Sequence, residues 1–240
     1  MVSDSNVVEL KSLSFSYPDG RQALRGITFS VSEGEKVGLV GPNGAGKSTV
    51  LLHLNGILRG QGEVHIDGAR VNGGDLGPIR RKVGLVFQDP DDQLFSPTVF
   101  DDVAFGPLYM GLEESEVRAR VAWALEQVQM SDHAMRMPHH LSLGEKKRVA
   151  IATVLSMSPT ILALDEPSAG LDPLARENLL ALLKRMPQTM IIASHDLDFV
   201  AQLCQRAIVL DEGRVLADVP AENILLNPSL LKRGHLYAAK

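Results

Sequence analysis

The sequence predicts an α/β fold in which a mostly parallel sheet is interrupted by a helical insert. Short apolar runs such as "KVGLV" (36–40) are typical of strands that are buried on both faces. Strand-like patterns nearly disappear from Asp89 to Met157 and return afterwards, alternating with helices. With 240 residues, 45% of them hydrophobic and 22% charged, the chain is long enough to form one large domain with a substantial core.

The first part of the chain carries most of the expected strands. Apolar and polar residues alternate in "VVELKSLSFSY" (7–17), and "GEVHIDGARV" (62–71) is typical of a hairpin that turns at Asp-Gly. Helical spacing with a glycine break predicts a helix over 48–58. The strands expected around it are 7–17, 23–35, 36–40 and 82–88.

The second part begins with the helical insert. Helices are expected near 98–110, 114–130 and 144–157, and strands at 160–166, 189–194 and 206–213, before a short helical tail. The predicted organisation is a single domain, 1–240. Its core comprises 1–88 and 158–240, and its helical subdomain comprises 89–157.

Composition and charge limit the partners and the cell compartment that the protein can have. The formal net charge is −5, so no overall basic field attracts nucleic acid, and no nucleic-acid partner is expected. Cys204 is the only cysteine, which fits a reducing compartment and a small buried side chain. No signal peptide or run of roughly 20 apolar residues is recognisable. The expectation is a cytosolic protein that reaches a membrane only through a partner.

Residues Gly41–Ser48, "GPNGAGKS", match the phosphate-loop pattern G-x-x-x-x-G-K-[ST] between a strand and a helix. Glycines let consecutive backbone N–H groups surround an anion, and the helix that follows directs its positive end to the same phosphates. Lys47 is expected to bridge the β- and γ-phosphates, and the Ser48 hydroxyl to bind Mg²⁺. A glycine-rich turn that contains lysine by chance is the alternative, but the strand–loop–helix context argues for a nucleoside triphosphate site.

Two acidic residues follow the apolar run "ILAL" at the end of another expected strand. Asp165 is expected to hold Mg²⁺ through water, and Glu166 to polarise the attacking water. The alternative is a pair of surface acids at a strand end.

The segment "LSLGEKKRVAIATVL" (141–155) has a local and a functional interpretation. Ser142 and Glu145 form an S-x-x-E capping box before an apolar helix. The capped start beside Gly144 also presents free N–H groups, which makes it a second anion-binding end. Within one chain it is expected to lie far from the phosphate loop, so it would act on the nucleotide of another subunit. The neighbouring His139 and His140 are expected in a solvated loop rather than in a metal site.

With these motifs in order, nearly the whole chain resembles the ATP-binding-cassette (ABC) ATPases. Taken alone, Tyr17 and His195 fit ordinary packing, but the family pattern also includes an aromatic at Tyr17, Gln88 after a strand, "SAGLD" (168–172) and His195 after "IIAS". The resemblance implies a phosphate-loop NTPase core with a mostly parallel sheet, an antiparallel β subdomain and an inserted α-helical subdomain. It also implies that the protein binds ATP and Mg²⁺ and works as a dimer, while a membrane partner binds the solute.

The resemblance also assigns roles to individual residues. Those implied in catalysis are Lys47, Glu166 and His195, and those implied in holding Mg²⁺ are Ser48, Gln88 and Asp165. The implied nucleotide contacts are Tyr17, Gly41, Pro42, Asn43, Gly44, Ala45, Gly46, Lys47, Ser48, Thr49 and Gln88, with Ser142, Gly144 and Glu145 from the partner subunit. The usual signature reads L-S-G-G-Q, so Leu143 and Glu145 are departures, and a capping role suits Glu145 better than a nucleotide contact.

Within the family, "FQDPDDQLFSPTVFDDVAFGP" (87–107) looks most like the ATPases of energy-coupling-factor importers, and "LLHLNGIL" before "GEVHIDG" looks like their cobalt and nickel branch. This implies a peripheral subunit on the cytoplasmic face of the cell membrane. Residues 88–110 are expected to dock on membrane subunits, because their apolar side chains are rimmed by acids at 89, 91, 92, 101 and 102. Vitamin importers such as those for biotin, other ABC transporters and ABC ATPases of ribosomes or chromosomes are the alternatives. A small-molecule kinase would not need 141–145 or His195.

Overall fold

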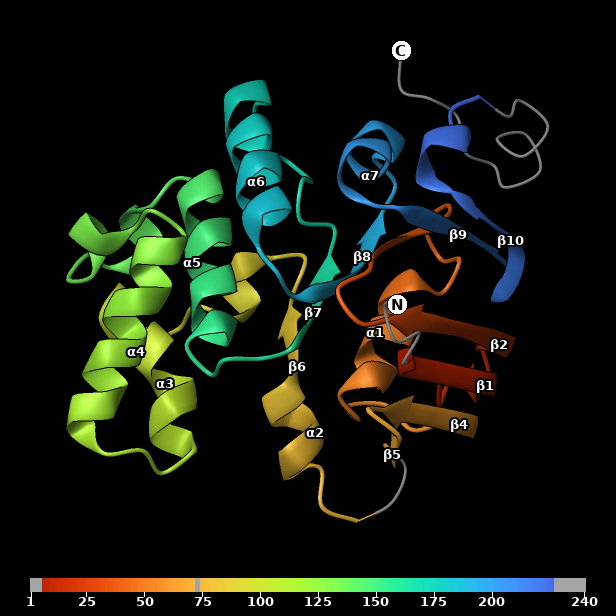
Figure 1. Cartoon of the computed structure of the whole chain (residues 1–240), viewed down its shortest axis with the longest axis horizontal. Helices are drawn as coiled ribbons and strands as arrows, with labels where there is room; N and C mark the ends of the chain where they lie inside the picture. The colour runs from red at the N-terminus through yellow and green to blue at the C-terminus, as the bar shows by residue number, and fades with distance from the viewer. Residues whose placement is uncertain (1–5, 72–73, 227–240) are drawn as a thin grey trace, which may run out of the picture. The chain divides into compact units, whose positions relative to one another are not determined.

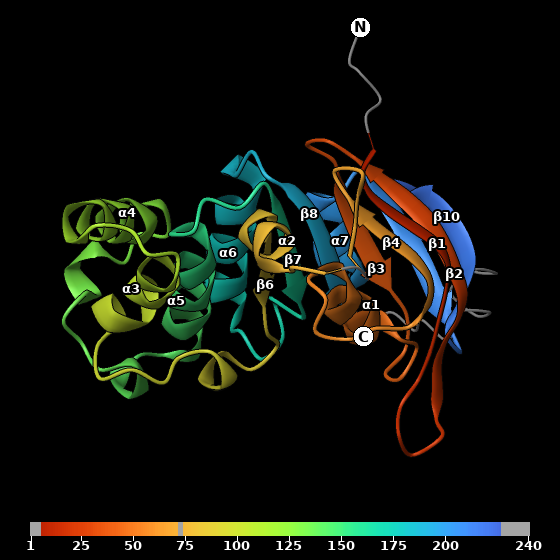
Figure 2. The same cartoon turned by 90° about the horizontal axis from the view of Figure 1, so that it is seen from below.

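The computed structural model describes residues 6–71 and 74–226, and it divides into two compact units (Figures 1 and 2). The first comprises Met1–Leu85, Thr160–Glu166 and Pro187–Lys240, and the second comprises Val86–Pro159 and Pro167–Met186. The sequence-based division differs mainly in placing residues 167–186 in the nucleotide-binding core.

A six-stranded sheet forms the centre of the first unit. Its strands are β3 (Lys36–Val40), β6 (Val83–Val86), β7 (Ile161–Asp165), β8 (Thr189–Ser194), β9 (Arg206–Asp211) and β10 (Arg214–Pro220). Strand β3 pairs in parallel with β8 and β9, β7 pairs in parallel with β8, and β10 pairs antiparallel with β9. Every residue of β3 and β8 is buried, which explains their continuous apolar runs. The sheet order is β10-β9-β3-β8-β7-β6.

A second, antiparallel sheet in the same unit has the order β2-β1-β4-β5. Its strands are β1 (Asn6–Ser16), β2 (Gln22–Ser32), β4 (Gln61–Ile66) and β5 (Ala69–Arg70), of which β1, β2 and β4 lie side by side in Figure 2. Asp67 and Gly68 have φ of 46° and 73°, as a two-residue hairpin turn requires. The predicted mostly parallel core, the antiparallel subdomain and the Asp-Gly hairpin are therefore confirmed.

The helices of the first unit are α1 (Lys47–Leu54), α2 (Gly77–Lys82) and α7 (Leu197–Leu203), with a 3₁₀ turn, η4 (Ala221–Asn223). The prediction of a helix over 48–58 was too long, because the helix ends before Gly56, whose φ of 72° is outside the helical region. Strand 206–213 was also too long, since Glu212 and Gly213 form the turn into β10. Most of the predicted helical tail lies outside the described residues.

The second unit is helical. Its helices α3 (Val99–Tyr109), α4 (Glu114–Gln127) and α5 (Leu143–Leu155) are neighbours in Figure 1, and α6 (Pro173–Arg185) belongs to the same unit. Short 3₁₀ turns, η1 (Pro90–Asp92), η2 (Ser131–His133) and η3 (Pro138–His140), join them. The side chains of Thr98, Ser142 and Asp172 cap the starts of α3, α5 and α6. The three helices predicted in this region are confirmed to within three residues at each end. None of the helices in the described ranges is long and apolar enough to cross a membrane.

Candidate nucleotide site

The phosphate loop joins the buried strand β3 to helix α1. Gly44 and Gly46 have φ of 83° and 105°, a conformation that residues with a Cβ rarely adopt. A Cβ at Gly41 would also collide with the backbone oxygen of Leu210. The glycines are therefore required by the backbone itself. They leave a loop of main-chain atoms at the start of a helix, which suits a polyphosphate.

Lys47, the first residue of α1, is buried, with only 6% of its side chain exposed. Its ammonium donates hydrogen bonds to the carbonyl oxygens of Gly41, at 2.8 Å, and Pro42, at 3.2 Å. It also lies 3.6 Å from Oε1 of Glu166. The phosphate loop therefore encloses the positive charge of Lys47 at the position where a bound phosphate would lie.

Glu166 follows the last residue of β7 and has a φ of 43°. Its backbone N–H donates to the carbonyl of Ala193, at 2.8 Å, which ties this bend to β8. Its carboxylate oxygen Oε2 lies 2.8 Å from Nδ1 of His195 and accepts from the Ser194 hydroxyl and the His195 N–H, both at 3.3 Å. The structure therefore brings the three predicted catalytic residues together around one carboxylate.

The remaining predicted ligands of the first unit lie on the same elements. Ser48 is exposed on the first turn of α1, and the partly exposed Asp165 ends β7 in register with Ala193 of β8. Hydroxyl and carboxylate oxygens are the ligand types that Mg²⁺ prefers, so these residues fit the ion.

The predicted adenine contact, Tyr17, follows strand β1 and is partly exposed. Its hydroxyl lies 3.0 Å from Oγ1 of Thr49 in α1, which connects it to the phosphate loop. The guanidinium of Arg21 lies over the ring, 4.8 Å from its centre, and Phe15 meets it edge to face. Nothing in the local sequence distinguishes Arg21 from a solvated turn residue, so its contact with Tyr17 could not be predicted.

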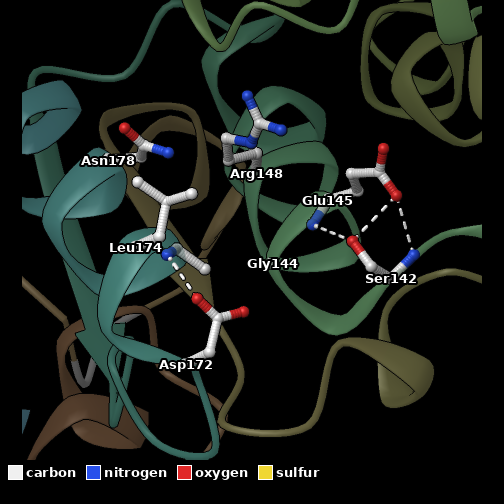
Figure 3. Close-up of a pocket in the computed structure, with 8 residues that line it drawn as sticks. Ser142, Gly144, Glu145, Arg148, Asp172, Leu174 and Asn178 are labelled. Carbon is white, nitrogen blue, oxygen red and sulfur yellow. Dashed lines mark hydrogen bonds between the residues drawn. The ribbon is translucent and has the colours of Figure 1, made fainter.

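In the second unit, the predicted capping box at the start of α5 is present. Glu145 Oε2 accepts from both the N–H and the hydroxyl of Ser142, each at 2.8 Å (Figure 3). These bonds, backbone first, lower the pKa of Glu145 below its usual value. Its other oxygen, Oε1, lies 3.4 Å from Nε2 of His133, a residue that the sequence analysis missed.

A pocket opens between the starts of α5 and α6 (Figure 3). A Cβ at Gly144 would lie 3.0 Å from the Cβ of Ala175, so a larger residue there would need a small shift of its neighbour. The residues that line the pocket are Ser142, Gly144, Glu145, Arg148, Asp172, Leu174, Ala175 and Asn178. The signature residues thus border an open surface of the second unit.

The segment 88–110 contains both buried and exposed apolar residues. Gln88 is exposed and its carbonyl accepts from Lys147 Nζ, at 3.3 Å. Asp102, which the sequence suggested as part of an acidic rim, is buried instead, because its Oδ1 accepts from the N–H groups of Phe95 and Ser96. The buried apolar residues are Leu94, Val99, Val103 and Ala104, and the exposed ones are Phe95, Phe105, Leu108 and Tyr109.

The adjacent histidines of the η3 turn, His139 and His140, are both exposed. Their rings contact each other at 4.3 Å between centres. No group of three or more metal-ligating side chains occurs within 6–71 or 74–226.

Comparison with known proteins identifies the family. Residues 24–169 match the family described as ABC transporter. An energy-coupling factor transporter ATP-binding protein, EcfA, of Methanothermobacter thermautotrophicus is 52% identical over 96% of this chain and 76% of its own length. A protein of Geobacter sulfurreducens named for ATP binding in an ABC transporter is 59% identical over 94% of this chain and 91% of its own length.

Solved structures agree with this assignment. The cbiO1 protein of Clostridium perfringens, part of the ABC transporter complex cbiONQ, superposes with a TM-score of 0.85 at 38% identity, covering 95% of this chain and 94% of that one. A dimeric ATP-binding cassette, MJ0796, bound to ADP and Pi after hydrolysis, superposes with a TM-score of 0.79 at 31% identity, covering 89% and 98%. Together with the phosphate loop and the Lys47–Glu166–His195 cluster, these matches show that the chain belongs to the ABC transporter family and is an ATPase whose hydrolysis of ATP is coupled to transport.

Proposed function

We propose that two copies of this chain form the pair of ATP-hydrolysing subunits of an energy-coupling-factor importer, and that the importer takes up cobalt or nickel. The observation that carries the enzymatic part is the Glu166 carboxylate, placed 3.6 Å from Lys47 and 2.8 Å from His195 beside the phosphate loop. The EcfA relatives and cbiO1 support the type of transporter.

In this proposal each predicted nucleotide-site residue has a distinct task. Lys47 and the loop N–H groups bind the β- and γ-phosphates, and the Tyr17 ring stacks on adenine. Ser48, Asp165 and Gln88 hold Mg²⁺, which supplies neutralising charge on the phosphate oxygens. Glu166 accepts the proton of the attacking water, and His195 holds its carboxylate and contacts the γ-phosphate.

The second copy completes each site. The start of α5 in one subunit, around Ser142 and Gly144, meets the γ-phosphate bound by the other, because the backbone N–H groups at this helix end favour a negative charge. The dimeric state of the similar cassette MJ0796 supports this arrangement. Hydrolysis then opens the dimer, because the γ-phosphate that joins the two subunits is lost.

Residues 88–110 form the proposed dock for a membrane subunit on the cytoplasmic face. Phe95 and Phe105 are 68% and 55% exposed and meet edge to face at 5.4 Å, which leaves an aromatic pair available to a partner. Exposed acids at 89, 91, 92 and 101 accompany them. An amphipathic helix with basic flanks suits this surface.

The docking proposal is tested with Asp92→Lys. Asp91 is unsuitable because it pairs with Lys146 at 2.7 Å, so its reversal would also disturb α5. Asp92→Lys, combined with Phe105→Ala, is expected to abolish assembly with membrane subunits while ATP hydrolysis by the isolated subunit is unchanged. Glu126→Lys on α4 is the matched control. Normal assembly of the double variant would remove this surface from the dock.

The solute is tested by purifying the complex from its native membrane and measuring ATP-dependent uptake in vesicles. The proposal predicts uptake of Co²⁺ or Ni²⁺ that stops when Glu166 is replaced by Gln. Uptake of biotin or another vitamin with no uptake of either ion would contradict the cobalt and nickel assignment and leave the importer type intact.

A further inference from the structure

The hydroxyl of Ser142 can donate one hydrogen bond, and the structure shows which atom accepts it. Glu145 Oε2 lies 2.8 Å from Ser142 Oγ, and an ionised carboxylate can only accept hydrogen bonds. The hydroxyl is therefore the donor of this bond. Its oxygen in turn accepts from the Glu145 N–H, at 3.4 Å.

A phosphate oxygen is also an acceptor, so it competes with Glu145 for the same proton. The hydrogen bonds from Ser142 lower the pKa of Glu145, which keeps the carboxylate ionised at neutral pH. The carboxylate is also held from its other side, where Oε1 faces Nε2 of His133 at 3.4 Å. It therefore places a negative charge beside the surface that is proposed to meet a polyanion.

We propose that Glu145 is a positioning residue that withholds the Ser142 hydroxyl from the partner's γ-phosphate and so weakens the closed, ATP-bound dimer. The inference rests on the proposed function, in which this surface meets the nucleotide of a second copy. The phosphate is then held by the N–H groups of Leu143 and Gly144 at the start of α5. A weaker closed state favours reopening of the dimer after each turnover.

The test measures dimer formation against Mg²⁺–ATP concentration by analytical ultracentrifugation. All proteins carry Glu166→Gln, so that bound ATP is not hydrolysed. Adding Glu145→Gln is expected to lower the ATP concentration for half-maximal dimer by roughly two- to tenfold, the range for one hydrogen bond. An amide oxygen is a weaker acceptor than a carboxylate, so the hydroxyl can turn to the phosphate, and the like charge is removed. Glu126→Gln, the same change of charge on α4, is expected to have no effect.

A double-mutant cycle separates this role from simple capping. Ser142→Ala removes the cap in either background, but it removes a phosphate contact only where Gln occupies position 145. Its effect on dimer formation is therefore expected to be several-fold larger with Glu145→Gln than with the native glutamate. Equal effects in the two backgrounds, or weaker dimers with Glu145→Gln alone, would overturn the inference.

The same experiment distinguishes the two levels of the proposal. If Glu166→Gln forms an ATP-dependent dimer that Glu145→Gln does not strengthen, only the role of Glu145 is wrong. If Glu166→Gln forms no dimer with ATP at any protein concentration tested, the dimeric function is wrong, and the role of Glu145 falls with it.

Discussion

Nδ1 of His195 lies 2.8 Å from Oε2 of Glu166, although 29 residues separate them in the sequence. The same carboxylate lies 3.6 Å from Lys47 through its other oxygen. A buried carboxylate in contact with a cation and with an exposed histidine is held in one orientation, so it can accept a proton from a water placed beside the phosphate loop. The catalytic predictions depend on this arrangement.

Glu166→Gln keeps the shape of the side chain but removes its ability to accept a proton. We expect ATP hydrolysis to fall by about 10²-fold or more, while ATP affinity changes little. Phosphate release and isothermal titration calorimetry measure the two quantities. A variant that hydrolyses ATP at the native rate would show that another group is the base.

Lys47→Ala removes the buried ammonium that lies within the loop. Hydrogen bonds to charged groups contribute roughly 1.5–3 kcal/mol each, so ATP affinity should fall by about a hundredfold. Lys11→Ala, which removes an exposed lysine of β1, is the matched control and should bind ATP normally. Calorimetric titration with ATP is the measurement, and near-native affinity for the Lys47 variant would refute the assignment.

Replacing Tyr17 tests its stacking and its hydroxyl separately. Tyr17→Ala should weaken ATP binding by roughly 1–3 kcal/mol, the usual contribution of one base–aromatic stack. Tyr17→Phe keeps the ring and loses only the bond to Thr49, so its affinity should stay close to native. Because stacking does not distinguish the edges of bases, the preference for ATP over GTP should be modest. A strong preference would require hydrogen bonds to the base.

His53 should make the stability of the fold dependent on pH. Burial in α1 lowers the pKa of His53 below its usual 6.5, although the bond from Nδ1 to the Thr49 carbonyl opposes this shift. The unfolded chain therefore binds this proton more readily, and the free energy of unfolding decreases as the pH falls below about 6.5. Urea unfolding at pH 7.5 and 5.5 measures the difference.

Two variants identify the source of that pH dependence. His53→Gln should reduce the loss of stability between pH 7.5 and 5.5, whereas His139→Gln, which replaces an exposed histidine, should leave it unchanged. An identical loss in the His53 variant would assign the effect to other groups.

The parts of the fold that the sequence predicts are those with local causes. The phosphate loop and the Asp67–Gly68 turn depend on backbone conformations that glycine permits, and the Ser142–Glu145 capping box depends on a spacing of three residues. The contact of His133 with Glu145 and that of Arg21 with the Tyr17 ring are set by how the chain folds around them. No periodicity or motif marks them in the sequence.

The buried strands were predictable for a similar reason, because a short continuous apolar run is typical of a strand that is covered on both faces. The short helices α2 and α7 were not predicted, because six and seven residues are too few to show a clear helical period. The acid at position 102 was misjudged because a buried carboxylate that accepts backbone hydrogen bonds has the same local sequence as an exposed one.

The dependence of ATP hydrolysis on protein concentration tests most directly the claim that each site is completed by a second copy. The rate of phosphate release per subunit is measured at saturating Mg²⁺–ATP over a wide range of concentrations of the native protein. This claim predicts that the rate per subunit rises with concentration until dimers predominate. A rate per subunit that is constant down to concentrations at which ultracentrifugation detects only monomer would contradict it.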